Sequence, residues 1–311
     1  MSGWRAASVA ILVGAVVLGV GWLIGRSDGD GGSTPPEASG SGHPTLACPA
    51  ALDAACRAAA DVVGTVTLRY RPGDPVPEGS VVLAAAGDLP AGQAEGASVV
   101  GRSPIVITMW RERALVLESS CSGAIDVACL ASAYGAGWDD LGGDAAWGLF
   151  KLGLADPTGS QAGLAAWWLI AGAGVPDGLG DSLRLRADDD GALLVEMAQF
   201  GDSRVDAAVA SEAAVAAQLE NVVGRGGRLE VFYPDPGPWI DVVASGAGRQ
   251  AARLIERLLE SDVQDALAGA GLRPVYGSTG LLPEGLGEPG TESQVPAEAD
   301  LASLVEAWLD S

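Results

Sequence analysis

The sequence is short of histidine and of basic residues, and both shortages exclude functions. Its 311 residues include one His, His43, and 18 Lys and Arg against 40 Asp and Glu, a formal net charge of −22. A zinc site built on two or more histidines is excluded, and a Ser-His-Asp triad would have to use His43. Nucleic-acid binding is disfavoured because affinity for phosphate backbones comes mainly from Lys and Arg.

The composition otherwise fits a folded protein. Apolar residues make up 48% of the chain, enough for most of it to fold around a core. Gly (45) and Pro (18) together stay below the roughly 25–30% that marks a low-complexity chain. A chain of 311 residues is longer than one compact domain usually needs, which favours two lobes.

The amino terminus carries the one long hydrophobic run. Residues 6–25 are 20 uncharged residues between Arg5 and Arg26, and as a helix they span roughly 30 Å, the thickness of the bilayer core. A cleavable signal peptide has a shorter apolar region, and the residues that follow here, Gly25-Arg26-Ser27-Asp28, include two charged residues, which disfavours cleavage. We therefore expect residues 1–26 to be an uncleaved transmembrane signal-anchor. The amino-terminal amine and Arg5 favour an inside start, which predicts a single-pass protein of the cell membrane with its C-terminal domain extracellular.

Residues 27–44 form the predicted tether between the membrane and the folded part. They are mostly Gly, Ser and Pro, a composition typical of a flexible linker. Because His43 lies in this tether, we expect it to be a solvated linker residue rather than a ligand.

The four cysteines repeat one spacing, with Cys48 and Cys56 in one pair and Cys121 and Cys129 in the other. An extracellular location permits disulfides, and two local bridges are the simplest of three connectivities. Eight residues of straight helix span about 12 Å, which exceeds the Cα separation of about 7 Å that a disulfide tolerates. Each bonded pair must therefore fold the chain back at one end of a helix. Free buried thiols, or a metal bound by Cys alone, are the alternatives.

From residue 45 onward short apolar runs alternate with amphipathic stretches, the pattern of a mostly parallel α/β fold. The predicted strands are Thr45–Cys48, Thr65–Arg69, Ser80–Ala85, Ile105–Met109, Leu149–Ala155, Ala207–Ser211, Leu229–Tyr233 and Asp241–Ser245. The predicted helices are Pro49–Val62, Gly123–Tyr134, Gln161–Gly172, Gly191–Gln199, Glu212–Val223, Gly248–Glu260 and Asp262–Gly269. Residues 277–311 read as a Gly/Pro-rich tail that ends in a short amphipathic helix, either a packed strap or a docking element for a partner.

Two kinds of segment are candidates for chemistry. Thr158 or Ser160 can cap the helix that follows residues 156–161, which would point its first backbone N–H groups beyond a strand end. The acidic runs Asp139–Asp140 and Asp188–Asp190 do not match the spacing of a calcium loop, and we expect a solvated acidic surface there.

Four stretches together resemble the type II periplasmic, or extracellular, solute-binding proteins, in the branch that includes molybdate-like binders. They are Ser103–Met109, Leu152–Gly163, Val231–Pro234 and Arg249–Pro274, the last of which includes Gly271, Arg273 and Pro274. The resemblance extends over about 230 residues, 45–274. It implies an α/β, two-lobed periplasmic-binding-protein type II fold, here preceded by one transmembrane helix. Lobe one would comprise residues 45–108 and 229–276, lobe two residues 109–228, and the solute-binding domain as a whole residues 45–276.

The resemblance also implies a cleft between the lobes, beyond the carboxyl ends of strands. Carried over by position, the ligand-binding residues would be Ala47, Ala84, Ala85, Ala86, Thr158, Gly159, Ser160 and Tyr233. Molybdate-like binders have hydroxyl residues in the first two of these loops, where this chain has alanines and Cys48. We therefore name no ligand.

The function that follows is capture of an unidentified small molecule between two hinged lobes, for uptake or sensing, without catalysis. We expect no catalytic residue, no metal and no cofactor. The expected partners are the membrane through residues 6–25 and either a transporter permease or an envelope protein, and not a nucleic acid. The alternative is a cell-envelope interaction module that has the same fold and a degenerate ligand cleft.

Overall fold

A computed structural model describes residues 44–72, 74, 78–89, 92–94, 96–121, 123–219, 221–222, 227–276, 281–295 and 298–310. All of them belong to one compact unit, His43–Ser311. The predicted membrane span at residues 6–25, residues 27–43 of the predicted tether and His43 itself lie outside the described residues. Among the helices of the described part, none is both long enough and apolar enough to cross a bilayer.

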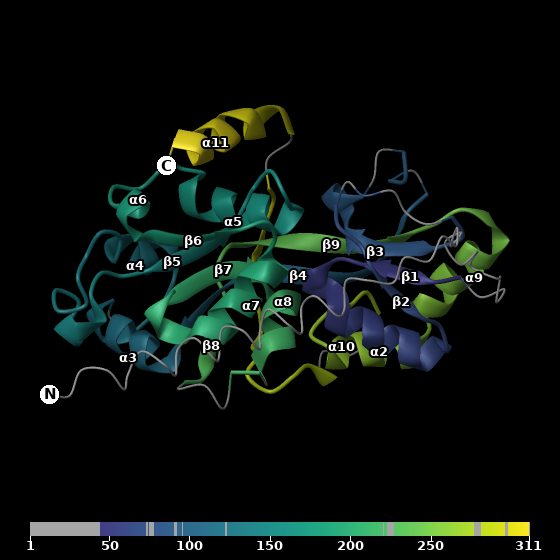
Figure 1. Cartoon of the computed structure of the whole chain (residues 1–311), viewed down its shortest axis with the longest axis horizontal. Coiled ribbons are helices and arrows are strands. Elements are labelled where there is room, and N and C mark those ends of the chain that lie inside the picture. Colours follow the sequence, from purple (N-terminus) through teal and green to yellow (C-terminus); the bar gives the residue numbers. More distant parts are fainter. Residues whose placement is uncertain are drawn as a thin grey trace, which may run out of the picture. The chain divides into compact units, whose positions relative to one another are not determined.

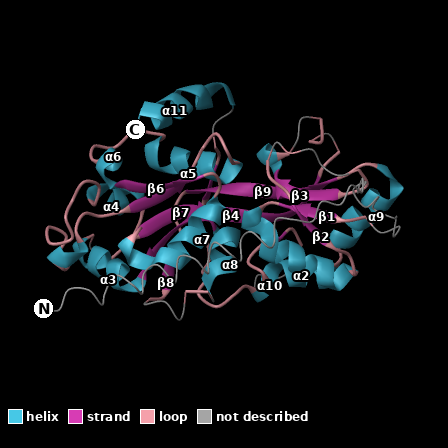
Figure 2. Cartoon of the chain, in the orientation of Figure 1, coloured by secondary structure: helices cyan, strands magenta, loops and turns pink. Residues whose placement is uncertain are grey.

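A single mixed sheet forms the centre of this unit (Figures 1 and 2). Its main path runs β2-β1-β3-β9-β4-β7-β5-β6, and β8, β10 and β11 pair with strands of this path. The strands are β1 (Leu46–Cys48), β2 (Thr67–Arg69), β3 (Val81–Ala85), β4 (Ser98–Trp110), β5 (Leu152–Ala155), β6 (Leu183–Ala187), β7 (Ala207–Ser211), β8 (Leu229–Phe232), β9 (Gly237–Ser245), β10 (Arg273–Pro274) and β11 (Glu292–Ser293).

The prediction of a mostly parallel sheet holds for the two outer parts and is wrong for the middle. β1 runs parallel to β2 and β3, and β5 runs parallel to β6 and β7. β9 is antiparallel to β3, and β4 is antiparallel to β7, β8 and β9. The two parallel parts are thus joined by long strands of opposite direction.

β4 is the longest of the described strands, and it takes part in both halves of the sheet. Its first residues pair with β9, up to Pro104 opposite Trp239. From Ile105 onward it pairs with β7, and from Ile107 with β8. We refer below to β1, β2, β3 and β9 as the first half of the sheet and to β5, β6, β7 and β8 as the second half.

Helices cover both faces of the sheet. They are α2 (Asp53–Val63), α3 (Arg111–Ser120), α4 (Val127–Ser132), α5 (Gln161–Ala171), α6 (Leu179–Ser182), α7 (Asp190–Phe200), α8 (Glu212–Leu219), α9 (Gly248–Leu258), α10 (Ser261–Gly269) and α11 (Glu298–Asp310), with 3-10 turns η1 (Ala50–Leu52), η2 (Ala86–Asp88), η3 (Ala145–Trp147) and η4 (Gly201–Ser203). Figure 1 shows α5 on one side of the sheet and α7 and α8 on the other.

The alternation of side chains along β4 explains these two layers. Ile105, Ile107 and Met109 pack into the core that contains the buried face of α5. Val106 and Trp110 point the other way, into the core that contains the buried residues of α7 and α8. Successive residues of a strand face opposite sides of its sheet, so a strand buried on both faces is mostly apolar at consecutive positions. The buried Thr108 interrupts the run, and its hydroxyl donates to the backbone oxygen of Glu230 at 3.2 Å.

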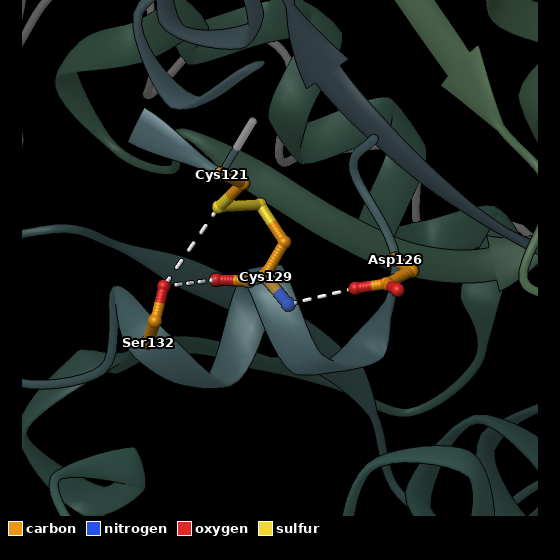
Figure 3. The surroundings of a disulfide bond; sticks show 4 residues. All are labelled: Cys121, Asp126, Cys129 and Ser132. Atoms are coloured by element: carbon orange, nitrogen blue, oxygen red, sulfur yellow. Dashed lines mark hydrogen bonds between the residues drawn. A yellow bond between two sulfur atoms is a disulfide. The ribbon is translucent and has the colours of Figure 1, made fainter. Parts of the chain in front are cut away.

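Both predicted local disulfides are present. Cys48 at the end of β1 is bonded to Cys56 in α2, with Cα atoms 6.4 Å apart, and Cys121 after α3 is bonded to Cys129 in α4, at 5.5 Å. In each pair the chain folds back at one end of a helix, as the spacing requires. Around the second pair, shown in Figure 3, Asp126 caps α4 by accepting from the Cys129 amide at 2.8 Å.

The C-terminal segment packs onto the fold as a strap. β11 pairs in parallel with β9, and Glu292 holds Arg102 of β4 through two hydrogen bonds of 3.0 and 2.6 Å. Farther on, Trp308 of α11 is 2% exposed, and its ring meets that of Trp167 of α5 at a centroid distance of 5.1 Å. Of the two interpretations of this helix, the packed strap is the one the structure supports.

A buried ion pair connects several of these elements. Arg273 of β10 donates to Glu212, the first residue of α8, through Nε at 2.9 Å and Nη2 at 2.7 Å. Tyr233, which follows β8, donates to the same carboxylate at 2.6 Å and accepts from the Gly287 amide at 2.9 Å. Glu212 is 0% and Arg273 4% exposed, and burial raises the pKa of the Glu212 carboxyl while its bonds to Arg273 and Tyr233 oppose that rise.

Replacing Arg273 by Ala should therefore destabilise the protein strongly, since it leaves a buried carboxylate without its cation. We expect the free energy of unfolding to fall by about 3–5 kcal/mol in urea unfolding followed by circular dichroism. Arg253→Ala, at an exposed position of α9, is the matched control and should stay within about 0.5 kcal/mol of wild type. A loss for Arg273→Ala no larger than that of the control would contradict this role.

Candidate functional site

A pocket lies where β4 changes its pairing from the first half of the sheet to the second. Its wall contains Ser103 of β4, Ile240 and Val242 of β9, and Ser211 at the end of β7. Its other lining residues are Pro49, Ala51, Leu52, Pro72, Ala85, Asp88, Ser160, Ala162, Asp189 and Asp190. The enclosed volume is about 30 Å³, more than the roughly 10–15 Å³ that one water molecule needs.

The lining residues come mostly from loops that leave the carboxyl ends of parallel strands. Pro49 follows β1, Asp88 lies just beyond β3, Ser160 lies beyond β5 and Asp189 beyond β6. Ligands of open α/β sheets bind in the crevice outside these strand ends. The pocket therefore lies where the topology favours a ligand, with residues of both halves of the sheet in its wall.

The two halves approach each other closely across this pocket, and two glycines permit it. A Cβ on Gly191, at the start of α7, would lie 2.5 Å from the backbone nitrogen of Ala51. A Cβ on Gly87 would lie 3.1 Å from Cδ of Gln161, the first residue of α5. A side chain at position 191 would push the two walls apart, whereas one at position 87 would require a small shift of the Gln161 side chain.

The helix starts around the pocket already have internal hydrogen-bond acceptors. At α5, Ser160 accepts from the Gly163 amide at 3.0 Å and Asp88 from the Gln161 amide at 2.6 Å. At α7, Asp189 accepts from the Ala192 amide at 2.7 Å. An oxyanion held by these backbone N–H groups would have to displace a side chain of the protein itself.

The start of α8 is satisfied in the same way. The Ala213 amide donates to Ser103 Oγ at 3.0 Å, and the Ser211 amide donates to Asp190 Oδ2 at 3.1 Å. The Ser211 hydroxyl donates to the same Asp190 oxygen. Asp190 is 2% exposed, so the expectation that residues 188–190 form a solvated acidic surface is wrong for this residue. Its carboxyl group points inward and accepts from both the amide and the hydroxyl of Ser211 at the end of β7.

Three carboxyl groups set the electrostatics of the pocket, and its described lining residues include no Lys, Arg or His. The pKa of Asp88 is raised from 3.8 to about 7, mainly by burial and also by the charges of Asp190 and Asp189, against the hydrogen bond from Gln161. Burial also raises the pKa of Asp190, against its bonds from Ser211. The pocket thus disfavours further negative charge.

The predicted ligand-binding residues fall into different places. Ala85 and Ser160 line the pocket together. Ala47 and Ala84 pack in a small core cluster with Tyr70 and Val82, while Ala86 begins η2.

The other three predicted residues, like Ala47, Ala84 and Ala86, do not line the pocket. Thr158 and Gly159 are exposed, and Thr158 donates through its amide and its hydroxyl to Asp156 at 2.8 and 2.7 Å. Tyr233 belongs to the Glu212–Arg273 cluster.

Sequence reasoning did not single out Asp88, Asp189, Ser103 or Ser211 as pocket residues. Asp88 lies two residues beyond the predicted loop 84–86, and Ser211 ends a predicted strand, so their positions beside strand ends were the available signal. β6, which leads to Asp189, was missed because Arg184 and Arg186 interrupt its apolar pattern.

The topology and the pocket define an α/β protein of the class that binds ligands at the carboxyl ends of its strands. The family model of bacterial extracellular solute-binding proteins matches residues 77–273. The chain therefore belongs to the bacterial extracellular solute-binding proteins. No curated protein sequence matches it.

Solved structures show the same fold at low sequence identity. The sulfate-binding protein SubI from Mycobacterium tuberculosis H37Rv is similar with a TM-score of 0.57 at 14% identity, covering 86% of this chain and 98% of that protein. A periplasmic thiamin binding protein is similar with a TM-score of 0.55 at 14% identity, covering 86% and 94%. Peb3 from Campylobacter jejuni is similar with a TM-score of 0.51 at 11% identity, covering 74% and 99%.

The role of Asp88 gives a test of the electrostatics. A carboxyl whose pKa is 3.8 when unfolded and about 7 when folded holds its proton more tightly in the folded state. Its contribution to stability is therefore fully present below about pH 4 and is lost as the pH rises through about 7. The quantity to follow is the free energy of unfolding of the wild type minus that of Asp88→Asn, measured by urea unfolding at each pH. We expect this difference to fall from pH 4 to 7 and then to stay level.

The control for this test is Asp61→Asn, which removes one exposed carboxylate of α2. Taking the difference between wild type and Asp88→Asn removes the contributions of the acids that do not interact with Asp88. A difference that does not change between pH 4 and 7 would contradict a buried, proton-binding Asp88.

Proposed function

We propose that this chain is a membrane-anchored extracellular solute-binding protein that captures a small molecule between two hinged lobes, for uptake or sensing. The observation that carries the proposal is the pocket at the carboxyl ends of the strands, whose wall contains residues of both halves of the sheet. A site built in this way changes its shape when the two halves move, which is how hinge closure encloses a ligand. The lobes would be residues 45–108 with 229–276, and residues 109–228.

The anchor and the transport partner are further parts of the proposal. The uncharged run of residues 6–25 supports a single membrane span, with the solute-binding domain outside the cell and residues 27–44 as its tether. An anchored binding protein stays close to the membrane, where a transporter permease or a sensor would receive the solute from it.

The chemistry of the pocket supports a neutral or positively charged solute. Asp88, Asp189 and Asp190 line it, together with the hydroxyls of Ser103, Ser160 and Ser211 and with apolar side chains. Hydroxyls donate hydrogen bonds to neutral polar groups and accept hydrogen bonds from them. Carboxylates accept hydrogen bonds, attract cations and repel oxyanions. The similar solved structures include proteins named for sulfate and for thiamin, so the fold by itself does not select the solute.

A second candidate function is an envelope interaction module that keeps this fold with a degenerate cleft. Two observations favour it: the pocket encloses about 30 Å³, and the amides at the starts of α5, α7 and α8 are bonded to side chains of the protein. In this case the pocket would hold water, and the outer surface would bind the partner.

A solute screen separates the two functions. The full chain is tested by thermal shift against amino acids, amines, sugars and oxyanions, and we expect a neutral or cationic compound to raise the midpoint of unfolding, because binding to the folded state alone stabilises it. Ala85→Leu should abolish that shift, since Ala85 lines the pocket and is 7% exposed.

The matched control is Ala252→Leu, at an exposed position of α9, which should keep the shift. A solute that binds the Ala85→Leu variant as well as the wild type would contradict the pocket assignment. No shift with any class of compound, together with capture of an envelope protein, would favour the interaction module.

A further inference from the structure

A reciprocal pair of hydrogen bonds joins the two halves of the sheet across the pocket. The Gln161 amide at the start of α5 donates to Asp88 Oδ1 at 2.6 Å. In return, the Gln161 side-chain oxygen accepts from the Gly87 amide at 2.7 Å. Gly87 and Asp88 lie in η2, directly after β3 of the first half, whereas α5 follows β5 of the second half. The two partners are separated by 73 or 74 residues of sequence.

Asp88 is thus bound as an anionic ligand would be. The N–H groups at the start of a helix, together with the helix dipole, favour a negative charge at that point. Here the carboxylate on the α5 start comes from the opposite wall of the pocket and not from α5 itself or from the residue before it. Ser160, the residue before α5, caps a different amide, that of Gly163.

Among the described residues that line the pocket around Asp88, none carries a positive charge. Asp189 and Asp190 at the start of α7 face it with negative charge. The hydroxyl of Tyr70 donates to the backbone oxygen of Asp88 at 3.4 Å. The described groups around this carboxylate therefore make the start of α5 its main stabilising contact.

We propose that the Asp88 carboxyl group is an internal ligand, which fills the anion position at the start of α5, holds the two halves of the pocket together and excludes anionic solutes. The proposal rests on the pocket being the solute site. A solute that needs the start of α5 must displace Asp88, while a neutral or cationic solute binds beside it. Asp88 is then the residue that determines the charge of the accepted solute.

Chemical rescue tests this directly. Asp88→Ala removes the atoms of one carboxylate, and formate is a carboxylate small enough to replace them. In the full chain carrying Asp88→Ala, sodium formate should raise the midpoint of thermal unfolding in a saturable way, by about 2 °C or more beyond the effect of equal sodium chloride. The wild type and Asp88→Asn, whose position is filled, should respond to formate as they do to chloride.

A second variant removes the donor. Gln161→Pro deletes the amide hydrogen at the first position of α5, where proline is well tolerated, and the preceding Ser160 already has the extended backbone that proline requires, with φ −154° and ψ 149°. The double variant Asp88→Ala, Gln161→Pro should lose the formate response. A response that survives in the double variant, or none in Asp88→Ala, would overturn the proposal.

Hydrogen exchange in the unmutated chain gives a test that needs no variant. The Gln161 amide should exchange much more slowly than in an unstructured peptide, because Asp88 accepts its hydrogen, and exchange at the peptide rate would overturn the proposal. Neither the formate response nor the hydrogen exchange depends on the small molecule that the protein is proposed to capture. If the solute screen fails, the proposed function is contradicted, and the formate result still stands. If Asp88→Ala does not respond to formate, the role of Asp88 as an internal ligand is contradicted, even when the screen finds a solute.

Discussion

The constraint on which this structure depends is the double pairing of β4. One strand, Ser98–Trp110, is hydrogen-bonded first to β9 and then to β7 and β8, so both halves of the sheet take their positions from it. The change of partner between Pro104 and Ile105 leaves Ser103 beside Ile240 and near Ser211, and these three residues form part of the pocket wall. The site is therefore a consequence of strand order: a pocket opens where one strand passes from one set of neighbours to the next.

The polar side chains of the pocket are bonded largely to backbone amides at the starts of the surrounding helices. Serines and aspartates satisfy the starts of α5, α7 and α8, and Asp88 does so from the opposite wall. Leaving a buried amide without an acceptor costs free energy, and so does burying a carboxylate without donors, so each group stabilises the other. This pairing explains how a strongly acidic chain can place the half-buried Asp88 close to the buried Asp190. The fold is shared with a sulfate-binding protein, whereas the amides at these helix starts are here bonded to side chains of the protein itself.

Much of the fold was accessible from the sequence because its strands are apolar runs. The runs at Ser80–Ala85, Ile105–Met109 and Ala207–Ser211 are all strands of the sheet, and the capping residue Ser160 stands where the pattern places a helix start. Prediction failed where burial and polarity disagree. α3 has the sequence RERALVLESS, which has the pattern of a polar surface segment. Its Arg113 is nevertheless only 3% exposed, because the guanidinium is bonded to the buried Asp206. β6 was missed for the same reason, since its two arginines mask an edge strand.

By itself the sequence determined the local features: the alternation of strands and helices, the two disulfides of spacing eight, and the resemblance to solute-binding proteins that the family match confirms. These depend on residues close together in the chain or on ordered motifs. The tertiary structure alone decided which polar groups meet. Asp88 and Gln161 are 73 residues apart and Glu212 and Arg273 are 61 apart, and nothing in either local pattern marks the partner. Such pairs form only after strand order has brought distant loops to the same edge of the sheet, and that order is set by packing over the whole chain.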